Sequence, residues 1–323
     1  MTYPVFWFQI RSFFVLLGYR QSHLPAVPVI IIATLLYFCT IAVASGRDCA
    51  SLKIGDSFYN LEGTVSYFED ISALRSLEEI QTDQSVSWLP LHDAVPSFGF
   101  SSSAYWLKFD LCSSKTEGGK AVLEISYPLL DSVRLFGVSN KAVIYNVYTG
   151  DTIPFIQRPE KHRNFLFFLP DFDRDILSIY IRVQTESAVQ VPMKLYTSAG
   201  FFKHNQNALF LQGCYFGIIL AMIFYNAFLF FSLREWSYLM YVFFTTSYFS
   251  FQAVLQGFFQ QFVLGSVWWQ NHALLLFGFV SILFANLFAD FFLNLPRKYP
   301  AISKILRSVG LVAALAAVLA SAL

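Results

Sequence analysis

An uncharged run of about 26 residues, Ala208 to Leu233, dominates the start of the second half of this chain. A helix of about 20 apolar residues crosses the hydrocarbon core of a bilayer, which is about 30 Å thick. A helix of that length in a soluble protein would carry a wide polar face, and this run has none. Composition agrees, because 13% of the residues are charged, against about 25% in soluble proteins. The run is therefore predicted to span a membrane.

Three more apolar runs follow, and we expect transmembrane helices at about 208–233, 237–259, 271–293 and 305–323, the last one truncated. The first and third connections between these helices contain the basic residues Arg234, Arg297, Lys298 and Lys304. The second connection contains Trp268 and Trp269, which are typical of a membrane–water interface, and no basic residue. Because basic residues stay on the cytoplasmic side, the first and third connections are predicted to be cytoplasmic.

The first 45 residues have the pattern of a targeting segment. Arg11 and Arg20 precede a long apolar run that ends in an A-x-A pattern at residues 42–44. Residues 1–45 are therefore either a cleaved signal peptide or an uncleaved signal anchor, because the run approaches the length of a membrane span. Either alternative places Ser51 and the residues after it outside the cytoplasm.

Between residues 51 and 200 the apolar pattern changes to a period of two, which is typical of strands with one buried face. "YWLKFDL" (105–111), "AVLEISY" (121–127) and "LSIYIRVQ" (177–184) all alternate in this way, and turn-forming residues separate such segments about every ten residues. We expect an all-β sandwich of the jelly-roll type at 51–200. A helical insertion is expected at "ISALRSLEEI" (71–80), and a connector at 201–207 that is helical or stiff.

The opposite faces of these strands carry polar and aromatic side chains that are candidate ligand contacts: Trp106, Lys108, Asp110, Glu124, Tyr180, Arg182 and Gln184. An aromatic ring among mixed polar groups suits a sugar or another small polar ligand. The alternative is an ordinary solvated sheet face with Trp106 tucked under a loop, because antiparallel sheets commonly have one polar face.

Two further groups of residues are candidates for structural roles. Cys49 and Cys112 would be exported together, so a disulfide between them is one alternative and two unpaired thiols the other. Polar residues inside the predicted helices are functional candidates or interhelical hydrogen-bond partners, and we favour the second role for the two asparagines. These residues are Asn226, Gln252, Gln256, Asn286 and Asp290. Asp290 is expected to reach the cytoplasmic interface.

No pattern in the chain predicts catalysis, a metal site or a cofactor. His92, His162 and His204 are scattered, and neither a Ser-centred elbow nor an H-E-x-x-H pattern occurs. The helices also lack the paired carboxylates and broken segments that are typical of transporters. We therefore expect no catalytic residues, no metal and no cofactor in this chain.

Several segments in a fixed order resemble one family of bacterial receptors. They are "FGFSSSAYWLKFDL" (98–111), "YPLLDSVRLF" (127–136), "IYIRVQTESAVQVPMKLYT" (179–197) and "LQGCYFGIILAMIFYNAFLFFSLREWSYLMYVFF" (211–244). Over about residues 55–320 the chain is similar to the seven-transmembrane receptors with diverse intracellular signalling modules, 7TMR-DISM. The resemblance implies an extracytoplasmic jelly roll like a carbohydrate-binding module, then seven helices, and a cytoplasmic output domain such as a kinase or cyclase.

We therefore predict a multi-pass receptor in the bacterial cytoplasmic (inner) membrane. It would sense a small molecule, with carbohydrates as one class, in the periplasm and relay the signal to an output domain beyond residue 323. The chain itself is not predicted to be an enzyme. Expected partners are the ligand, the lipid bilayer and, from the family, a second copy in a homodimer. A net charge of +1 gives no reason to expect nucleic acid. The alternative is a membrane-anchored glycan-binding or envelope-assembly protein without signalling output.

Overall fold

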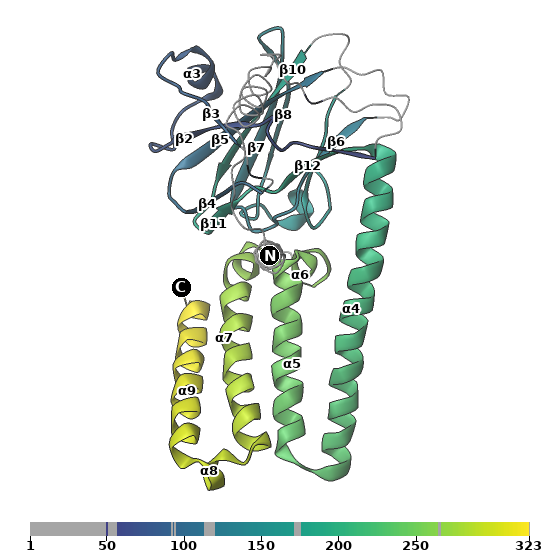
Figure 1. Cartoon of the computed structure of the whole chain (residues 1–323), viewed down its shortest axis with the longest axis vertical. Helices are drawn as coiled ribbons and strands as arrows, with labels where there is room; N and C mark the ends of the chain where they lie inside the picture. Colours follow the sequence, from purple (N-terminus) through teal and green to yellow (C-terminus); the bar gives the residue numbers. More distant parts are fainter. Residues whose placement is uncertain are drawn as a thin grey trace, which may run out of the picture. The chain divides into compact units, whose positions relative to one another are not determined.

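The computed structural model of the protein describes residue 50 and residues 57–91, 93, 95–112, 120–170, 176–263 and 266–322. The predicted leader at 1–45 lies outside these residues, and so does Cys49. Up to Thr197 the described chain is mainly β-structure, and from Ser198 onward it is helical (Figure 1).

One sheet has six antiparallel strands in the order β3–β2–β5–β10–β7–β8. The long strands β5 and β10 pair in its centre, with Leu107 opposite Ile181 and Trp106 opposite Arg182. The strands are β2 (Ser66–Asp70), β3 (Leu89–Pro90), β5 (Ala104–Cys112), β7 (Ser132–Ser139), β8 (Ala142–Thr149) and β10 (Ile176–Gln184).

A second sheet has four antiparallel strands in the order β1–β12–β6–β9. These are β1 (Phe58–Asn60), β6 (Ala121–Ile125), β9 (Phe165–Phe168) and β12 (Met193–Thr197). A small two-stranded sheet pairs β4 (Ser97–Phe100) with β11 (Ala188–Gln190), and the 3-10 turn η1 spans Phe155–Gln157.

The inner faces of the two larger sheets share one apolar core, which makes this part a β-sandwich. Leu107 and Ile181 of the six-stranded sheet are fully buried in the same cluster as Leu123, Phe167 and Leu195 of the four-stranded sheet. The alternation predicted for "YWLKFDL", "AVLEISY" and "LSIYIRVQ" is confirmed, because the residues assigned to the apolar face all pack in or against this core. The predicted β-sandwich is therefore confirmed, and its jelly-roll type stays a prediction.

Residues 71–88, which we call the cover segment, connect β2 to β3 across the outer face of the six-stranded sheet. The segment contains the short helix α3 (Leu77–Thr82), which overlaps the region 71–80 where a helical insertion was predicted. Ser76 and Glu79 form a capping box, in which each side chain accepts a hydrogen bond from the other's backbone N–H. Leu77 and Ile80 point inward and pack with Trp106, Phe136 and Tyr180 of the sheet.

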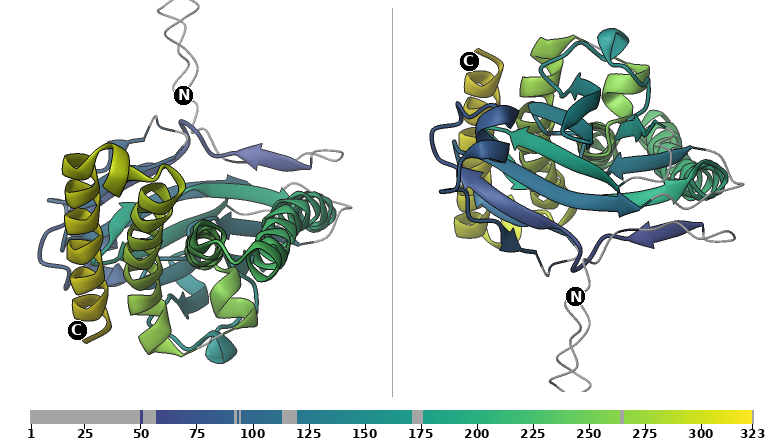
Figure 2. Two further views of the ribbon diagram at one scale, coloured as in Figure 1. Left: turned by 90° about the horizontal axis from the view of Figure 1, so that it is seen from below. Right: turned by 90° about the horizontal axis from the view of Figure 1, so that it is seen from above.

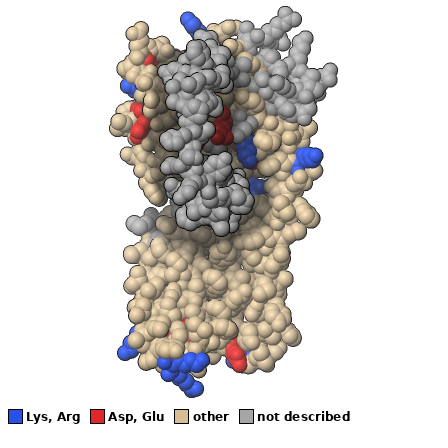
Figure 3. Space-filling model, viewed as in Figure 1, with Lys and Arg blue, Asp and Glu red and all other residues tan. Residues whose placement is uncertain are grey.

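The helical half contains four long helices in sequence, and each packs on the next (Figures 1 and 2). They are α4 (Ser198–Leu233), α5 (Trp236–Leu255), α7 (Val267–Phe292) and α9 (Pro300–Ala322), with the short helices α6 (Phe258–Phe262) and α8 (Leu295–Lys298) between them. Figure 3 shows a wide band of this half without charge and a group of basic side chains at one end. These helices form the predicted transmembrane bundle.

Among the described residues, three helices are long and apolar enough to cross a membrane: Ser198–Leu233, His272–Phe292 and Pro300–Leu319. The helix α5, predicted as a fourth span, contains several hydroxyl side chains that lower its hydropathy. Two of them are internally bonded, because Thr245 donates to the carbonyl oxygen of Tyr241 at 2.8 Å and Ser247 to that of Phe243 at 2.7 Å. Such bonds reduce the cost of placing hydroxyl groups in hydrocarbon.

The connection between the sandwich and the bundle is a continuous helix. Where a separate connector was expected at 201–207, α4 begins at Ser198, directly after β12. Thr197 caps the helix by accepting a hydrogen bond from the N–H of Gly200 at 3.1 Å. Gly200 packs directly on the chain before β1, because a Cβ on it would lie 1.9 Å from the carbonyl oxygen of Ser57. The first turn of α4 is therefore docked on the four-stranded sheet.

The described residues include two cysteines, Cys112 and Cys214. Cys112, at the end of β5, is disulfide-bonded. Its predicted partner, Cys49, lies outside the described residues, so the pairing stays a prediction. The neighbouring Ala50 pairs with this end of β5, donating to the carbonyl oxygen of Asp110 at 2.8 Å and accepting from the N–H of Cys112 at 2.9 Å. Cys214 in α4 is a free thiol.

Candidate functional site

The seven ligand candidates do not lie on one surface. Six of them, Trp106, Lys108, Asp110, Tyr180, Arg182 and Gln184, lie on the outer face of the six-stranded sheet, as the alternation requires. The seventh, Glu124, lies on β6 in the other sheet, opposite Lys194 of β12. Glu124 therefore belongs to a different part of the molecule.

Three of the six candidates are not open to solvent in the way that a ligand platform requires. Trp106 is 1% exposed and Tyr180 is 7% exposed, because the cover segment packs on both. Lys108 lies between two rings, with its Nζ 5.7 Å from the ring centre of Trp88 and 5.3 Å from that of Tyr180. These side chains mainly hold the cover segment on the sheet. The alternative of Trp106 tucked under a loop describes the structure better than an exposed aromatic platform.

Asp110 and Gln184 also have partners within the sheet. The hydroxyl of Ser178 donates to Asp110 Oδ1 at 2.7 Å. Gln184 Oε1 accepts from Arg182 Nη2 at 2.9 Å. Gln184 therefore helps to orient Arg182, while Asp110 lies toward the far end of β5 from the cover segment's contact with Arg182.

A cleft of about 730 Å³ opens between the cover segment and the β7–β8 side of the sheet. Residues 74–78 of the cover segment form one wall, and Trp106, Arg134, Phe136 and Arg182 form the sheet side. Asn146 and Tyr148 of β8 complete the lining on the sheet side. Its size is within the range of small-molecule sites, which is about 300–1,000 Å³. This cleft is the candidate ligand site.

Two arginines face each other in the cleft lining. Arg182 on β10 is directly opposite Arg134 on β7 in the strand register. Arg182 Nη2 donates to the carbonyl oxygen of Ala73 at 2.6 Å, which ties the cover segment to the sheet. Arg134 Nε donates to Asn146 Oδ1 at 3.1 Å, and its guanidinium carbon lies 5.0 Å from the ring centre of Phe136. Burial lowers the pKa of Arg182, and the positive charge of Arg134 acts in the same direction.

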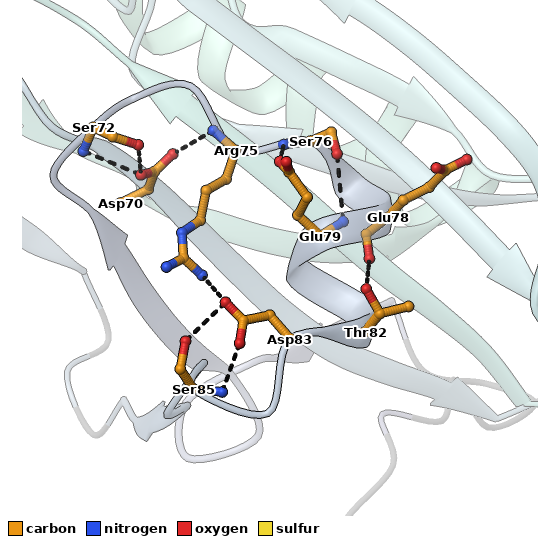
Figure 4. Close-up of polar contacts among 9 residues, drawn as sticks. All are labelled: Asp70, Ser72, Arg75, Ser76, Glu78, Glu79, Thr82, Asp83 and Ser85. Atoms are coloured by element: carbon orange, nitrogen blue, oxygen red, sulfur yellow. Dashed lines mark hydrogen bonds and ion pairs between the residues drawn. The ribbon is translucent and has the colours of Figure 1, made fainter.

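A network of polar contacts fixes the shape of the cover segment (Figure 4). Asp70 at the end of β2 accepts from the Ser72 hydroxyl at 2.6 Å and from the Arg75 N–H at 3.0 Å. The Arg75 side chain then reaches Asp83 at 2.8 Å. The N–H and hydroxyl of Ser85 hold the pKa of Asp83 below its ordinary value, and Arg75 adds to this effect. The wall of the cleft is thus held at both ends of α3.

Glu124 belongs to a second polar region, at the junction of the sandwich and the helices. The carboxylate is buried and accepts from Asn164 Nδ2 at 2.6 Å. The N–H of Asn164 in turn donates to His162 Nδ1 at 3.1 Å, and His162 Nε2 lies 3.2 Å from Asn205 Oδ1 of α4. The prediction that Glu124 lies on the same sheet face as Trp106 is therefore wrong.

Two buried arginines of the loop between β8 and β9 contact the helical half directly. Arg158, 3% exposed, donates from Nη2 to Gln260 Oε1 of α6 at 3.1 Å. Arg163 donates from Nη1 to Gln212 Oε1 of α4, and Gln212 Nε2 donates to Gln256 Oε1 at 2.8 Å. We call Arg158, Arg163, Gln212, Gln256 and Gln260 the junction cluster. It links the sandwich to three successive parts of the helical half.

Close backbone packing accompanies these hydrogen bonds. Gly257, between α5 and α6, has a φ of +74°. A Cβ there would lie 2.8 Å from the carbonyl oxygen of Arg163. The guanidinium carbon of Arg163 also lies 4.8 Å from the ring centre of Phe258. Glycine is therefore needed at position 257 both for the left-handed backbone and for the approach of the arginine loop.

The junction also contains several buried polar atoms that have no hydrogen-bond partner in the described part of the structure. They include Arg158 Nε and Nη1, Arg163 Nε, Gln260 Nε2, Glu124 Oε2 and Asp151 Oδ1. Four of these six atoms belong to Arg158, Arg163 and Gln260 of the junction cluster.

Asp151 gives the region next to the junction a pH-dependent charge. Burial, together with the neighbouring Asp131 carboxylate, raises the pKa of Asp151 to about 7, and Arg158 opposes the shift. Burial lowers the pKa of Arg158 to about 10, and Asp151 opposes that shift. Protonated Asp151 is thus favoured in the folded state relative to the unfolded chain.

We expect Asp151→Asn to flatten the dependence of sandwich stability on pH. Protonation of Asp151 contributes stability to the folded state. This contribution is fully present below the ordinary pKa of 3.8 and is lost as the pH rises through the folded-state pKa of about 7. Stability of the wild-type sandwich should therefore fall over this range, and that of Asp151→Asn should fall less. The stability of the sandwich at each pH is measured by hydrogen exchange of the β8 amides in the full chain. Asp93→Asn, an exposed carboxylate, is the matched control, and an equal pH dependence in all three proteins would contradict the assignment.

The polar residues inside the helices divide into two groups. Asn226 donates to the Met222 carbonyl at 2.9 Å and Asn286 to the Ile282 carbonyl at 2.7 Å, each within its own helix. The prediction that these two asparagines bond to neighbouring helices is therefore wrong for the described residues. Gln252 likewise donates to the Tyr248 hydroxyl within α5, at 2.7 Å. Gln256, in contrast, joins helices through Gln212.

Asp290, unlike the two asparagines, bonds to a neighbouring helix. It is 1% exposed, so its carboxylate is buried between helices, and that it lies at the depth of the membrane interface stays a prediction. Its Oδ2 lies 2.8 Å from Nε of Arg307, which forms an ion pair between α7 and α9. Sequence analysis missed Arg307, because position 307 was assigned to an apolar run that begins at Ile305.

Comparison with protein families agrees with this division of the chain into a sandwich and a helical half. A family model described as 7TMR-DISM extracellular 2 matches residues 62–197, and one described as 7TM diverse intracellular signalling matches residues 208–323. The chain belongs to the 7TMR-DISM family. A search of curated proteins found no match. This 7TMR-DISM chain is accordingly a membrane receptor whose extracellular domain precedes its membrane helices.

The cleft and the junction have different positions relative to the two matched segments. All residues that line the cleft belong to the extracellular match. The junction cluster joins the two matches, with Arg158 and Arg163 in the first and the three glutamines in the second. Of the residues that line the cleft or form the junction, sequence analysis found Trp106, Arg182 and Gln256. Arg134 had a usable signal, because alternation in "SVRLFGV" places it on the outer face.

Proposed function

We propose that this 7TMR-DISM chain senses a small polar molecule in the cleft of its periplasmic sandwich and relays binding to its transmembrane helices. The bacterial inner membrane is the proposed location, with Arg234 and the basic residues around α8 on the cytoplasmic side. That orientation is supported by the position of the basic residues at one end of the helices.

The junction cluster is the observation that carries the proposal. A receptor needs a connection through which one arrangement of the sandwich favours one arrangement of the helices. Arg158 and Arg163 supply two such contacts, to α6 and to α4. The continuous helix α4 supplies a third, because its first turn packs on the sandwich while its 36 residues extend for about 54 Å. A flexible tether would transmit far less.

A route from the cleft to the junction also exists along the chain. Ser132 lines the cleft, and its neighbour Asp131 acts on Asp151. Asp151 in turn interacts with Arg158 of the junction cluster. A measured response of the helices to a bound ligand tests coupling along this route.

We expect a bound ligand to change the distance between spin labels at Leu233 and Leu293, which end α4 and α7 and are both exposed. The distance is measured by double electron–electron resonance on the full chain in lipid nanodiscs. Glucose, N-acetylglucosamine, glucuronate and inorganic phosphate are the probes. Arg163→Gln should abolish the change while ligand binding is retained, because it weakens the junction and leaves the cleft intact.

Lys161→Gln is the control for this experiment, since Lys161 is an exposed residue of the same loop. It should respond as the wild type does. If a probe binds and the distance distribution stays the same, relay is contradicted. The chain would then be a membrane-anchored binding protein without signalling output, which is the alternative function.

A further inference from the structure

We propose that the cleft selects an anionic ligand, and that Arg134 and Arg182 together hold its carboxylate or phosphate group. The inference rests on the proposed function as a sensor and adds the chemical class of what is sensed. Neither the family assignment nor the fold specifies this class.

The first step is the electrostatic conflict between the two arginines. Arg134 and Arg182 are directly opposite on neighbouring strands. Like charges in that position destabilise a sheet. In the part of the chain that the structure describes, neither arginine forms an ion pair with a carboxylate; the ion pairs there are Arg75–Asp83 and Arg307–Asp290. A bound anion would remove the conflict.

The second step concerns the nearest carboxylate. Asp70 attracts Arg182 through space. Its oxygens, however, accept hydrogen bonds from Ser72 and from the backbone of Arg75, so they hold the cover segment. Glu78 is the one carboxylate among the described lining residues, and it belongs to the cover-segment wall. The sheet side of the cleft therefore keeps a net positive charge.

The third step is that both guanidinium groups are held in place. Arg182 is fixed by its bonds to Ala73 and Gln184. Arg134 uses its Nε–H for Asn146 and lies over the ring of Phe136. Each arginine has five N–H donors in a rigid plane. The bond to Asn146 occupies one donor of Arg134, and its terminal N–H groups suit a two-pronged contact to a carboxylate or phosphate.

The remaining lining indicates what else the ligand carries. Phe136 and Tyr148, the latter 47% exposed, present aromatic surface, and Ser76, Ser132 and Asn146 present neutral polar groups. Aromatic surface with a few polar groups suits a ring that bears hydroxyl groups. The ligand class is therefore a small hydroxylated molecule with one anionic group, such as a uronic acid or a sugar phosphate.

The test is calorimetric titration of the full chain in detergent micelles with charged and neutral partners at constant ionic strength. Glucuronate and glucose 6-phosphate are each compared with glucose. We expect at least one charged member to bind about tenfold or more tightly than glucose, as charge-assisted hydrogen bonds allow. The tighter of the two identifies carboxylate or phosphate as the source of the charge. Arg134→Gln should remove the preference, and Lys194→Gln, an exposed strand residue outside the cleft, should keep it.

A second measurement does not depend on the rest of the ligand. Inorganic phosphate, compared with chloride at equal ionic strength, should slow hydrogen exchange in β7 and β10 of the wild type and have no such effect in Arg134→Gln. In the absence of phosphate, Arg134→Gln should exchange no faster than the wild type, because it removes the opposed charge. If phosphate has no effect on wild-type exchange, the anion site is overturned.

The two proposals fail in different ways. Equal binding of glucose and its charged partners, or a charge preference that survives Arg134→Gln, overturns the anion site and leaves sensing intact. Anion binding that depends on Arg134 supports the anion site even if the spin labels at the ends of α4 and α7 do not move. That combination would overturn the relay alone.

Discussion

Trp106→Ala is expected to destabilise the outer layer of the sandwich by about 3–5 kcal/mol, the usual effect of removing a buried large aromatic ring. Trp106 is 1% exposed and stacks on Phe136, with ring centres 6.0 Å apart. Removing it would leave a cavity in the cluster in which Leu77 and Ile80 of α3 pack on the sheet. Hydrogen exchange in the full chain should therefore accelerate in α3, β5 and β10.

Trp106→Phe should have a much smaller effect, about 1 kcal/mol, because the ring contact largely remains. The indole Nε1–H is buried and donates to no residue in the described part of the structure, so Trp106→Phe removes no hydrogen bond between residues. Phe100→Ala is the matched control, since Phe100 is 83% exposed. If Trp106→Ala and Phe100→Ala change exchange equally, the cover segment does not depend on this ring.

These effects decide how ligand binding should be studied. Trp106 is a natural choice from the sequence, because an aromatic residue on a sheet face is typical of sugar sites. A loss of binding in Trp106→Ala would, however, have two causes, a missing contact or a displaced cover segment. Arg134 is exposed, and its side-chain contacts among the described residues are to Asn146 and Phe136 of the sheet, so Arg134→Gln removes a charge from the cleft without removing a contact to the cover segment.

The fold of the sandwich could be predicted because it depends on a local pattern. Each strand shows its buried face by alternation, and Leu107, Ile181 and Leu123 all face the core as expected. Whether the opposite face is exposed or covered could not be predicted in the same way. It depends on where residues 71–88 dock, which is a tertiary contact between segments that are far apart in the sequence. A helix at that place could be expected, but its position over Trp106 could not.

The same distinction holds for the candidate site and the junction. Arg182 was found because it lies on a clearly alternating strand, and Arg134 was within reach of the same reasoning. Arg158 and Arg163 lie in a loop without periodicity, and their respective partners, Gln260 and Gln212, are amides of the mainly apolar helical half. Nothing local shows that these residues meet. Buried polar contacts between domains depend on how the domains are placed, and that information is not carried by sequence periodicity.

The ion pair between α7 and α9 gives the second large expected effect. Arg307→Gln should weaken the packing of these helices by about 2–3 kcal/mol, whereas Asp290→Asn should cost about 1 kcal/mol. The asymmetry follows from burial, because the Asp290 side chain is 2% exposed and that of Arg307 is 56% exposed. Removing the arginine leaves a charged carboxylate between helices. Removing the carboxylate's charge leaves an arginine that can turn toward the headgroups.

Hydrogen exchange of the α9 amides in nanodiscs distinguishes these cases. The order of increasing exchange should be wild type, Asp290→Asn, then Arg307→Gln, with Arg297→Gln, an exposed basic residue of α8, close to the wild type. The double variant Asp290→Asn/Arg307→Gln should exchange more slowly than Arg307→Gln alone, because no buried charge remains. Additive effects in the double variant would mean that the two residues act separately. The packing of α9 on α7 would then depend on apolar contacts such as the close approach at Gly310, where a Cβ would lie 3.3 Å from Leu283 Cδ1.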